Sequence, residues 1–221
     1  MNQKTIVIIP ARGNSKRLPN KNIKLLGGIP LLEHSINYAK QYDFIDAIYV
    51  TTNDEEIKKI AFKNDVLVVD RPDELSGDLE PTVSALKHVL ESIDNVVENI
   101  ILLQPTNPLR PKKLLEKAYR IFIDNDFNSL FTVTRDYKKF GEIKDGIFKP
   151  FNYKPGQRSQ DLEPLFFENG LLYITKVKHI IDNKIITKDA YPMEVNHPFS
   201  AIDIDTQEDF DYAIFLKDYL K

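Results

Sequence analysis

The apolar positions along the chain follow two alternating periods. Val- and Ile-rich runs of strand length recur at residues 5–9, 47–51, 66–69, 100–104 and 129–134. Segments with apolar residues at helical spacing lie between them, beginning after Pro30 and around Ile57, Val83 and Leu114. Strand followed by helix, repeated in this way, predicts right-handed crossovers and a mainly parallel sheet with helices on both faces. We therefore expect a doubly wound α/β domain.

The pattern changes after about Arg135, where short strand-like pieces and turn residues follow without a clear helix. We interpret residues 136–195 as an insertion that extends the sheet or builds an interface arm, because it is rich in Phe, Tyr and Pro. Within it, residues 165–175 are expected to form a strand, or a hairpin that turns at Asn169-Gly170. Residues 1–135 and 196–221 then form the α/β domain, which closes with a strand at 200–204 and a helix from 206 to about 219.

The composition indicates a globular protein. The chain of 221 residues is 42% hydrophobic and 29% charged, which excludes disorder, collagen and coiled coil. It contains no cysteine, which excludes disulfides, thiol catalysis and cysteine-ligated metals. The first apolar run meets Pro10 and Arg12 too early for a signal peptide or a membrane span. We therefore expect a cytoplasmic protein without a membrane partner.

The charge is unevenly distributed. A net charge of -3 argues against a nucleic-acid partner. Residues 1–32 nevertheless hold six cations and no acid, whereas the other 189 residues carry 24 cations and 33 acids. This distribution indicates a local positive site at the start of the chain. The alternative interpretation is a solvated basic loop that serves only solubility.

The loop after the first strand combines backbone freedom with positive charge. Gly13 and Ser15 allow close approach of the backbone, so that amide groups can turn inward. Arg12, Lys16 and Lys21 bring full charges to the same concavity, at the edge of the sheet where open α/β folds bind ligands. A polyphosphate would satisfy these groups, although the spacing fits neither a P-loop nor a dinucleotide fingerprint.

Asp203 and Asp205 are the second candidate feature. On a strand their side chains project to the same side, and two carboxylates suit a Mg²⁺ ion that also holds phosphates. A structural interpretation stays open, because Thr206 and Asp209 resemble a capping box that would leave Asp205 beside a helix N-terminus.

With both features in view, the chain resembles the acylneuraminate cytidylyltransferases, which join CTP to a nine-carbon 2-keto sugar acid. The resemblance covers nearly the whole chain, and its motifs occur in the family's order. They are Ile9-Pro10-Ala11-Arg12-Gly13-Asn14-Ser15-Lys16 with Leu18-Pro19-Asn20-Lys21-Asn22, Thr51-Thr52-Asn53-Asp54-Glu55-Glu56-Ile57, Arg71-Pro72-Asp73-Glu74-Leu75, Leu102-Leu103-Gln104-Pro105-Thr106-Asn107-Pro108-Leu109-Arg110, Gln160-Asp161-Leu162, Asn169-Gly170 and Ile202-Asp203-Ile204-Asp205-Thr206.

The resemblance implies a Rossmann-like nucleotidyltransferase fold and a Mg²⁺-dependent in-line transfer of a cytidylyl group from CTP to a nonulosonic acid, with release of pyrophosphate. Residues 1–135 and 196–221 would form the nucleotide-binding and catalytic domain, and 136–195 the sugar-site and dimerisation arm of a homodimer. It further implies a nucleotide site at Ala11, Arg12, Asn22, Arg71 and Thr82, triphosphate contacts from Arg12, Lys16 and Lys21, sugar contacts from Gln104 and Asn169, and Mg²⁺ at Asp203 and Asp205.

Two departures from the family pattern leave the sugar open. Arg158-Ser159 stands where many relatives have paired arginines, and Phe167 stands where an arginine is common. Arg158 is therefore our candidate for binding the sugar carboxylate, and a legionaminic or pseudaminic acid relative stays open as the substrate. No histidine is well placed by sequence, so we expect Asp205 or a hydroxide held by Mg²⁺ to accept the proton of the attacking hydroxyl.

Three alternatives remain. The chain could be another sugar nucleotidyltransferase, or a glycosyltransferase that holds a nucleotide sugar with Asp-x-Asp and releases a nucleoside diphosphate. From a different class, it could be a noncatalytic nucleotide-binding subunit. The joint presence of Arg12, Lys21, Asp203 and Asp205 argues against the last, because binding alone would tolerate loss of the metal pair.

Overall fold

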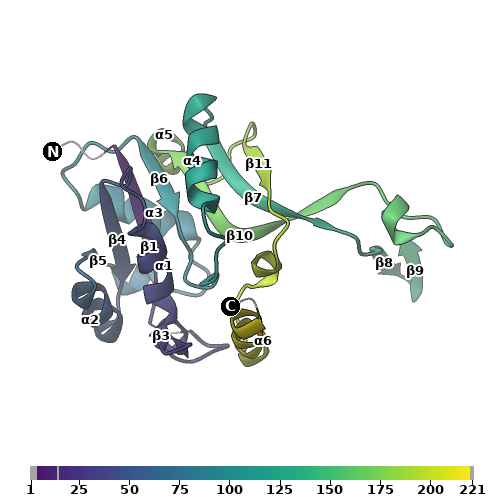
Figure 1. Cartoon of the computed structure of the whole chain (residues 1–221), viewed down its shortest axis with the longest axis horizontal. Coiled ribbons are helices and arrows are strands. Elements are labelled where there is room, and N and C mark those ends of the chain that lie inside the picture. Colours follow the sequence, from purple (N-terminus) through teal and green to yellow (C-terminus); the bar gives the residue numbers. More distant parts are fainter. Residues whose placement is uncertain (1–3, 14, 220–221) are drawn as a thin grey trace.

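A seven-stranded sheet forms the centre of the protein (Figure 1). The structure, a computed structural model, describes residues 4–13 and 15–219, so that Asn14 of the first loop lies outside the described residues. The strands in spatial order are β11 (Tyr191–Glu194), β7 (Ser129–Asp136), β10 (Leu165–Lys176), β6 (Asn99–Leu102), β1 (Thr5–Pro10), β4 (Ala47–Thr52) and β5 (Leu67–Asp70). Only β10 of this sheet runs against its neighbours, β6 and β7.

Helices cover both faces of the sheet because the buried strands are apolar on both sides. The six described helices are α1 (Leu31–Ala39), α2 (Glu55–Lys63), α3 (Thr82–Glu91), α4 (Leu114–Asp124), α5 (Val177–Ile181) and α6 (Gln207–Tyr219). From β1, Val7 and Ile9 pack in the core with α1, α2 and α4, whereas Ile6 and Ile8 pack with α3 and α5. The doubly wound, mainly parallel α/β fold is confirmed. No helix in the described part of the chain has the length and apolar character to cross a membrane.

Residues 165–176 form one strand, so the expected hairpin at Asn169-Gly170 is wrong and the expected strand is correct. The register of β10 against β7 shifts between Glu168 and Tyr173, which marks a bulge rather than a turn. Gly170 in this bulge has φ of 72°, and a Cβ there would lie 2.8 Å from Oδ1 of Asn107. The glycine therefore serves both the backbone conformation and a close approach.

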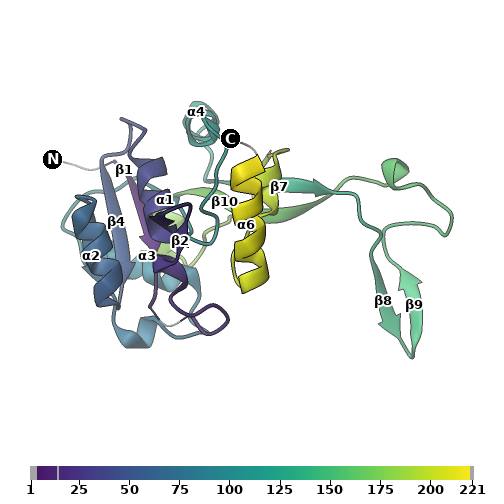
Figure 2. The same ribbon diagram turned by 60° about the horizontal axis from the view of Figure 1, so that its bottom comes forward.

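The segment 136–195 divides between the sheet and a projection. Its strands β10 and β11 belong to the main sheet, whereas residues 137–164 extend away from it (Figures 1 and 2). This arm carries the hairpin of β8 (Gly141–Lys144) and β9 (Ile147–Pro150). The short helix α5 follows β10 and was not predicted, because its five residues are too few to show a helical period in the sequence.

A third apolar cluster joins the two ends of the chain. It contains Leu18 and Leu26 near the short hairpin β2 (Leu25–Leu26) and β3 (Ile29–Pro30), together with Ile202, Ile204 and residues of α6. The strand expected at 200–204 is wrong, because residues 198–201 form a 3₁₀ turn and 202–205 pair with no strand. The side chains of residues 202–205 still alternate between inside and outside, because Ile202 and Ile204 are both buried in this cluster. Asp203 and Asp205 therefore face outward together.

Candidate active site

A cavity of about 300 Å³ lies where the carboxyl ends of the parallel strands meet residues 203–205. Arg12 follows β1, Arg71 follows β5 and Gln104 follows β6, so three separate strands contribute to its wall. The expected site residues that line it are Arg12, Lys21, Asn22, Arg71, Thr82, Gln104, Asp203 and Asp205. Residues from the beginning and the end of the chain thus share one cavity.

An adjoining cavity of about 290 Å³ is lined by four cations, two aspartates and two neutral polar residues. Arg12 and Lys21 belong to both cavities, and Lys16 and Arg17 line only this second one. We call this second cavity the cationic lobe. Four cations line this space with only two carboxylates, Asp78 and Asp205, and the excess of positive charge is suited to a polyphosphate.

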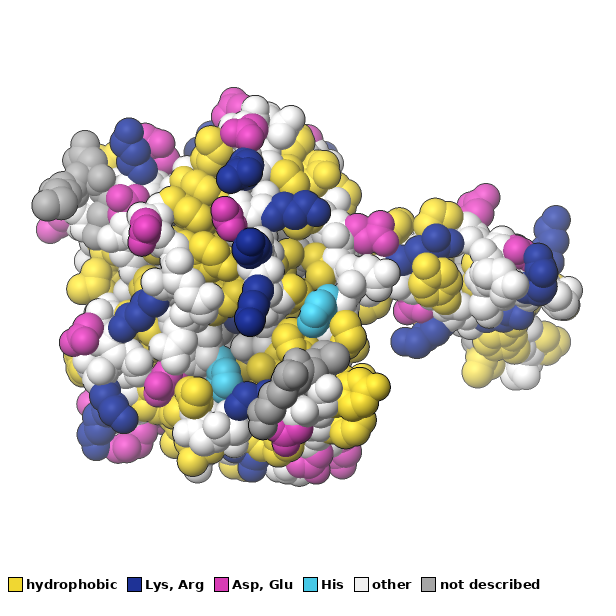
Figure 3. All heavy atoms as spheres, in the orientation of Figure 1, with side chains coloured by type: hydrophobic (Ala, Val, Ile, Leu, Met, Phe, Trp, Pro, Cys, Tyr) yellow, Lys and Arg dark blue, Asp and Glu magenta, His cyan; other side chains and the backbone are white. Residues whose placement is uncertain are grey.

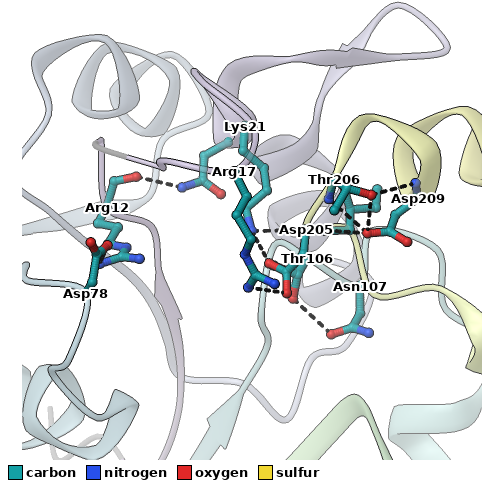
Figure 4. A network of polar contacts seen from close by, with 11 residues as sticks. Arg12, Arg17, Lys21, Asp78, Thr106, Asn107, Asp205, Thr206 and Asp209 are labelled. Atoms are coloured by element: carbon teal, nitrogen blue, oxygen red, sulfur yellow. Dashed lines mark hydrogen bonds and ion pairs between the residues drawn. The ribbon is translucent and has the colours of Figure 1, made fainter.

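The carboxylate of Asp205 connects the first loop to the end of the chain (Figure 4). Nζ of Lys21 lies 2.8 Å from its Oδ1 and donates also to the carbonyl oxygen of Ile204, at 2.9 Å. Arg17 donates to its Oδ2 at 2.7 Å. Arg17 was not among the expected site residues, and its position in the basic run beside Lys16 was the only signal for it.

The capping box expected between Thr206 and Asp209 is confirmed. Oδ2 of Asp209 accepts from the amides of Asp205 and Thr206, at 3.0 and 2.8 Å. The Thr206 hydroxyl accepts from the Asp209 amide at 3.3 Å, which completes a reciprocal cap at the start of α6. The side chain of Asp205 therefore takes no part in the cap and points toward Lys21.

Asp203 differs electrostatically from Asp205. Burial raises the pKa of Asp203 above its usual range, and the charge of Asp205 adds to the rise, although a hydrogen bond from Thr106 opposes it. Both carboxylates line the cavity. A divalent cation at this place would relieve the repulsion between them.

The donor set fits Mg²⁺ that is bound together with a triphosphate. Among the described residues, no group of three or more His, Asp or Glu side chains could hold a metal ion alone. Mg²⁺ is usually held by one or two carboxylates while water and substrate phosphates complete its shell. Asp203 and Asp205 supply that number.

Arg71 is buried without a partner for part of its guanidinium group. Only 8% of the residue is exposed, and its Nε and Nη2 atoms have no hydrogen-bond partner in the described structure. Burial lowers its pKa to about 10, with a further contribution from the charge of Arg12. An unpaired buried cation on a cavity wall is a strong indication of a binding site, because an acceptor on a ligand would offset its desolvation.

The first loop is held in place by contacts within the chain. Asn22 donates to the carbonyl oxygen of Arg12 at 2.8 Å, while Ala11 lies fully buried beneath the loop and does not line the cavity. A Cβ on Gly13 would lie 2.5 Å from Oδ2 of Asp54, and the Gly13 amide donates to Asn53 at 3.2 Å. The close approach at Gly13 is thus to the chain itself, and this amide does not turn inward as expected.

The buried side chain of Asn107 joins three segments of the site. It donates to the carbonyl oxygens of Asn169 at 3.2 Å and Ile202 at 2.6 Å. Asn169 does not line the cavity, because Thr132, Thr134 and the Leu171 amide occupy its side chain. Gln104 does line it. In the sequence Asn107 stands out only as part of a motif, and its role follows from these contacts.

Arg158 lies on the arm, away from the cavity. It is exposed and pairs with Asp161 through two hydrogen bonds of 2.7 and 3.1 Å. It lines neither of the two cavities described above. Within one copy of the chain it is therefore not brought together with the other expected site residues.

Comparisons with known proteins agree on one class. A family model described as Cytidylyltransferase matches residues 6–219. An N-acylneuraminate cytidylyltransferase of Streptococcus agalactiae serotype III (strain NEM316) is 31% identical over 226 residues, 96% of this chain and 52% of that protein. The chain thus spans about half the length of that relative. A pseudaminic acid cytidylyltransferase of Campylobacter jejuni (strain 81-176) is 32% identical over 224 residues, 96% of both chains.

Among solved structures, a CMP:2-keto-3-deoxy-manno-octonic acid synthetase complexed with CTP has a similar fold. Its TM-score is 0.74 with 14% sequence identity, and the match covers 99% of this chain and 100% of that one.

Proposed function

Because the chain belongs to the cytidylyltransferase family, we propose that it transfers a cytidylyl group from CTP to the anomeric 2-hydroxyl of a nonulosonic acid. One observation supports this proposal most. Arg12 and Lys21 of the first loop line the same cavity as the carboxylates of Asp203 and Asp205, at the carboxyl ends of the strands, and Lys16 lines the adjoining one. Nucleotidyl transfer needs this arrangement, since an anionic sugar must approach an anionic triphosphate.

The proposed reaction is an in-line displacement. The 2-hydroxyl oxygen forms a bond to the α-phosphorus of CTP while the bond to the bridging oxygen breaks and pyrophosphate leaves. Arg12, Lys16 and Lys21 stabilise the negative charge on the phosphates and on the leaving group. Mg²⁺, when bound at Asp203 and Asp205, would supply further charge neutralisation. Arg71 and Thr82 line the wall assigned to the cytidine, with Asn22 holding the loop beneath it.

The hydroxyl proton needs an acceptor in the same space. Asp205, the acceptor expected from sequence, already accepts from Lys21 and Arg17 through its two oxygens. Asp203 makes no ion pair with the described residues, and burial raises its pKa. We therefore extend the proposal to Asp203 as the second candidate acceptor, with Asp205 oriented by its two cations.

We also propose a homodimer formed through the arm. An isolated two-stranded hairpin is marginally stable in water, and β8 and β9 are exposed along their whole length. The exposed apolar side chains of the arm include Ile143, Ile147, Phe148 and Phe151. Figure 3 shows hydrophobic side chains, in yellow, on the surface of the arm at its right. A second copy would cover them and could bring its Arg158 toward the sugar.

A substrate panel tests the proposed function. The chain is incubated with Mg²⁺, CTP or GTP, and one of several 2-keto sugar acids: N-acetylneuraminic, legionaminic, pseudaminic and 2-keto-3-deoxy-manno-octonic acid. We expect pyrophosphate release only when CTP and a nine-carbon acid are both present. In sedimentation, we expect the protein to behave as a dimer. Release of a nucleoside diphosphate instead would indicate a glycosyltransferase, and release of neither product with any acid would contradict the proposal.

A further inference from the structure

Asp78 lies between two cations of the cationic lobe. Its Oδ1 is 2.9 Å from Nη1 of Arg12, and its Oδ2 is 2.6 Å from Nζ of Lys16. Figure 4 shows the carboxylate turned toward Arg12, across the cavity from Asp205. The hydrogen bond from Lys16 lowers the pKa of Asp78, so the group carries its charge at neutral pH. The two oxygens of Asp78 are thus paired with Arg12 and Lys16, cations that the proposed function assigns to the triphosphate.

We propose that Asp78 takes the place of a phosphate group in the nucleotide-free protein and that a nucleoside polyphosphate has to displace it. The identity of the natural ligand rests on the proposed function, but the competition itself rests on Arg12, Lys16 and Asp78 alone. A carboxylate and a phosphate present similar pairs of oxygens to a guanidinium or ammonium group. Asp78 pairs with Nη1 of Arg12 and with Nζ of Lys16, so a phosphate group that takes the same donor positions has to displace the carboxylate.

The segment that carries Asp78 is suited to such a displacement. Residues 76–81 lie between the 3₁₀ turn Asp73–Leu75 and α3 and belong to no helix or strand. Arg12 holds the segment also through the carbonyl oxygen of Ser76, at 3.3 Å. The side chains of Asp78 and Lys16 are 36% and 82% exposed. Exposed ion pairs contribute little to stability, so a ligand of higher charge can break them.

The competition makes Asp78 a specificity-determining residue for the length of the phosphate chain. A ligand that reaches both Arg12 and Lys16 replaces both broken ion pairs with contacts of its own. A ligand that reaches only one of them gains a single contact, while Asp78 stays paired with the other cation and continues to compete. The apparent affinity for any such ligand is reduced by the fraction of molecules in which Asp78 occupies the lobe.

Glu80 offers a matched control on the same segment. Glu80 and Asp78 both line the first cavity and carry the same charge. The side chain of Glu80, however, accepts from Ser84 and makes no ion pair with the described residues. Replacing Glu80 by Gln removes one negative charge near the phosphates without removing the contact to Arg12 and Lys16. Any effect of Asp78→Asn beyond that of Glu80→Gln therefore belongs to the contact.

The test uses a single fluorescent label. The chain has no cysteine, and Leu79, next to Asp78, is 97% exposed, so Leu79→Cys gives one labelled site on the segment. Labelled chains with Asp78, Asp78→Asn or Glu80→Gln are titrated with inorganic tripolyphosphate and with phosphate, without divalent cations. This probe carries no base and no transferable group, so the result does not depend on cytidylyl transfer.

We expect tripolyphosphate to change the fluorescence emission of the labelled chain that retains Asp78. The labelled Asp78→Asn chain should show this changed emission before any ligand is added. Asp78→Asn should bind tripolyphosphate about fivefold more tightly than Glu80→Gln. Equal affinities of the two variants, weaker binding by Asp78→Asn, or an emission that binding does not change would overturn the proposal. If the label responds as expected and CTP yields no pyrophosphate, only the proposed function fails.

Discussion

Asp203→Asn is expected to lower kcat/KM by about a hundredfold or more, because it removes one of the two carboxylates assigned to Mg²⁺ at the reacting phosphates. The variant should need more Mg²⁺ for half-maximal activity. It should not lose thermal stability, since burial and the neighbouring Asp205 already disfavour a charge at Asp203. Initial rates of pyrophosphate release over a range of Mg²⁺ concentrations, together with Tm, measure both effects.

Asp211→Asn is the matched control for this experiment. Asp211 is exposed on α6 and accepts from Gln207 at 2.7 Å, away from the cavity wall. It carries the same formal charge and lies eight positions along the chain from Asp203. A normal Mg²⁺ dependence of Asp203→Asn, or an equal loss of activity in Asp211→Asn, would contradict the assigned role of the pair.

Arg71→Met is expected to raise stability while it weakens nucleotide binding. In the free protein, the buried guanidinium has two nitrogen atoms without partners, so its removal should raise the free energy of unfolding by about 1 kcal/mol. The same nitrogens are assigned to CTP, and their loss should raise KM for CTP about tenfold to a hundredfold. Denaturant unfolding and steady-state kinetics measure the two effects separately.

A second buried arginine gives the opposite expectation and serves as the control. Arg110 is 6% exposed, and burial lowers its pKa also to about 10. Its guanidinium, however, donates to the carbonyl oxygens of Leu171 and Gln104 and to the hydroxyl of Ser35. Arg110→Met should therefore destabilise the fold. If both variants lower stability equally, Arg71 is a structural residue and the assignment is wrong.

The parallel part of the fold could be predicted from sequence because its strands are buried on both faces. Continuous apolar runs such as residues 5–9 and 100–104 occur where helices cover both sides of a sheet, and the structure places β1 and β6 there. Residues 200–204 show where the same reasoning fails. Their alternation of apolar and acidic residues is that of a strand, but burial of Ile202 and Ile204 against α6 produces the same alternation without a ladder.

The site was predictable where charge and loop position coincide. Arg12, Lys21 and Asp205 follow from a basic loop at a strand end and an acidic pair near the chain's end, and the structure brings them together. Arg17 and Asp78 were missed, because an ion pair between distant segments leaves no pattern in either one.

The role expected of Asn169 depends on the direction in which its side chain points, and the spacing of residues along the sequence does not determine that direction. Its side chain turns toward Thr132 and Thr134 instead of the cavity. Its backbone carbonyl accepts from Asn107, which also bonds the segment of Asp203 through Ile202. In the sequence, Asn169-Gly170 is a turn signal, but packing decides in which direction the side chain of Asn169 points.

The most direct test is a crystal structure of the chain with CTP and Mn²⁺ in place of Mg²⁺, in which anomalous scattering locates the metal. We expect one metal ion held by the phosphates and by the carboxylates of Asp203 and Asp205, with Arg12 and Lys21 in contact with the same triphosphate. A nucleotide bound elsewhere, or phosphates held by the loop cations while the metal lies away from both aspartates, would contradict the account.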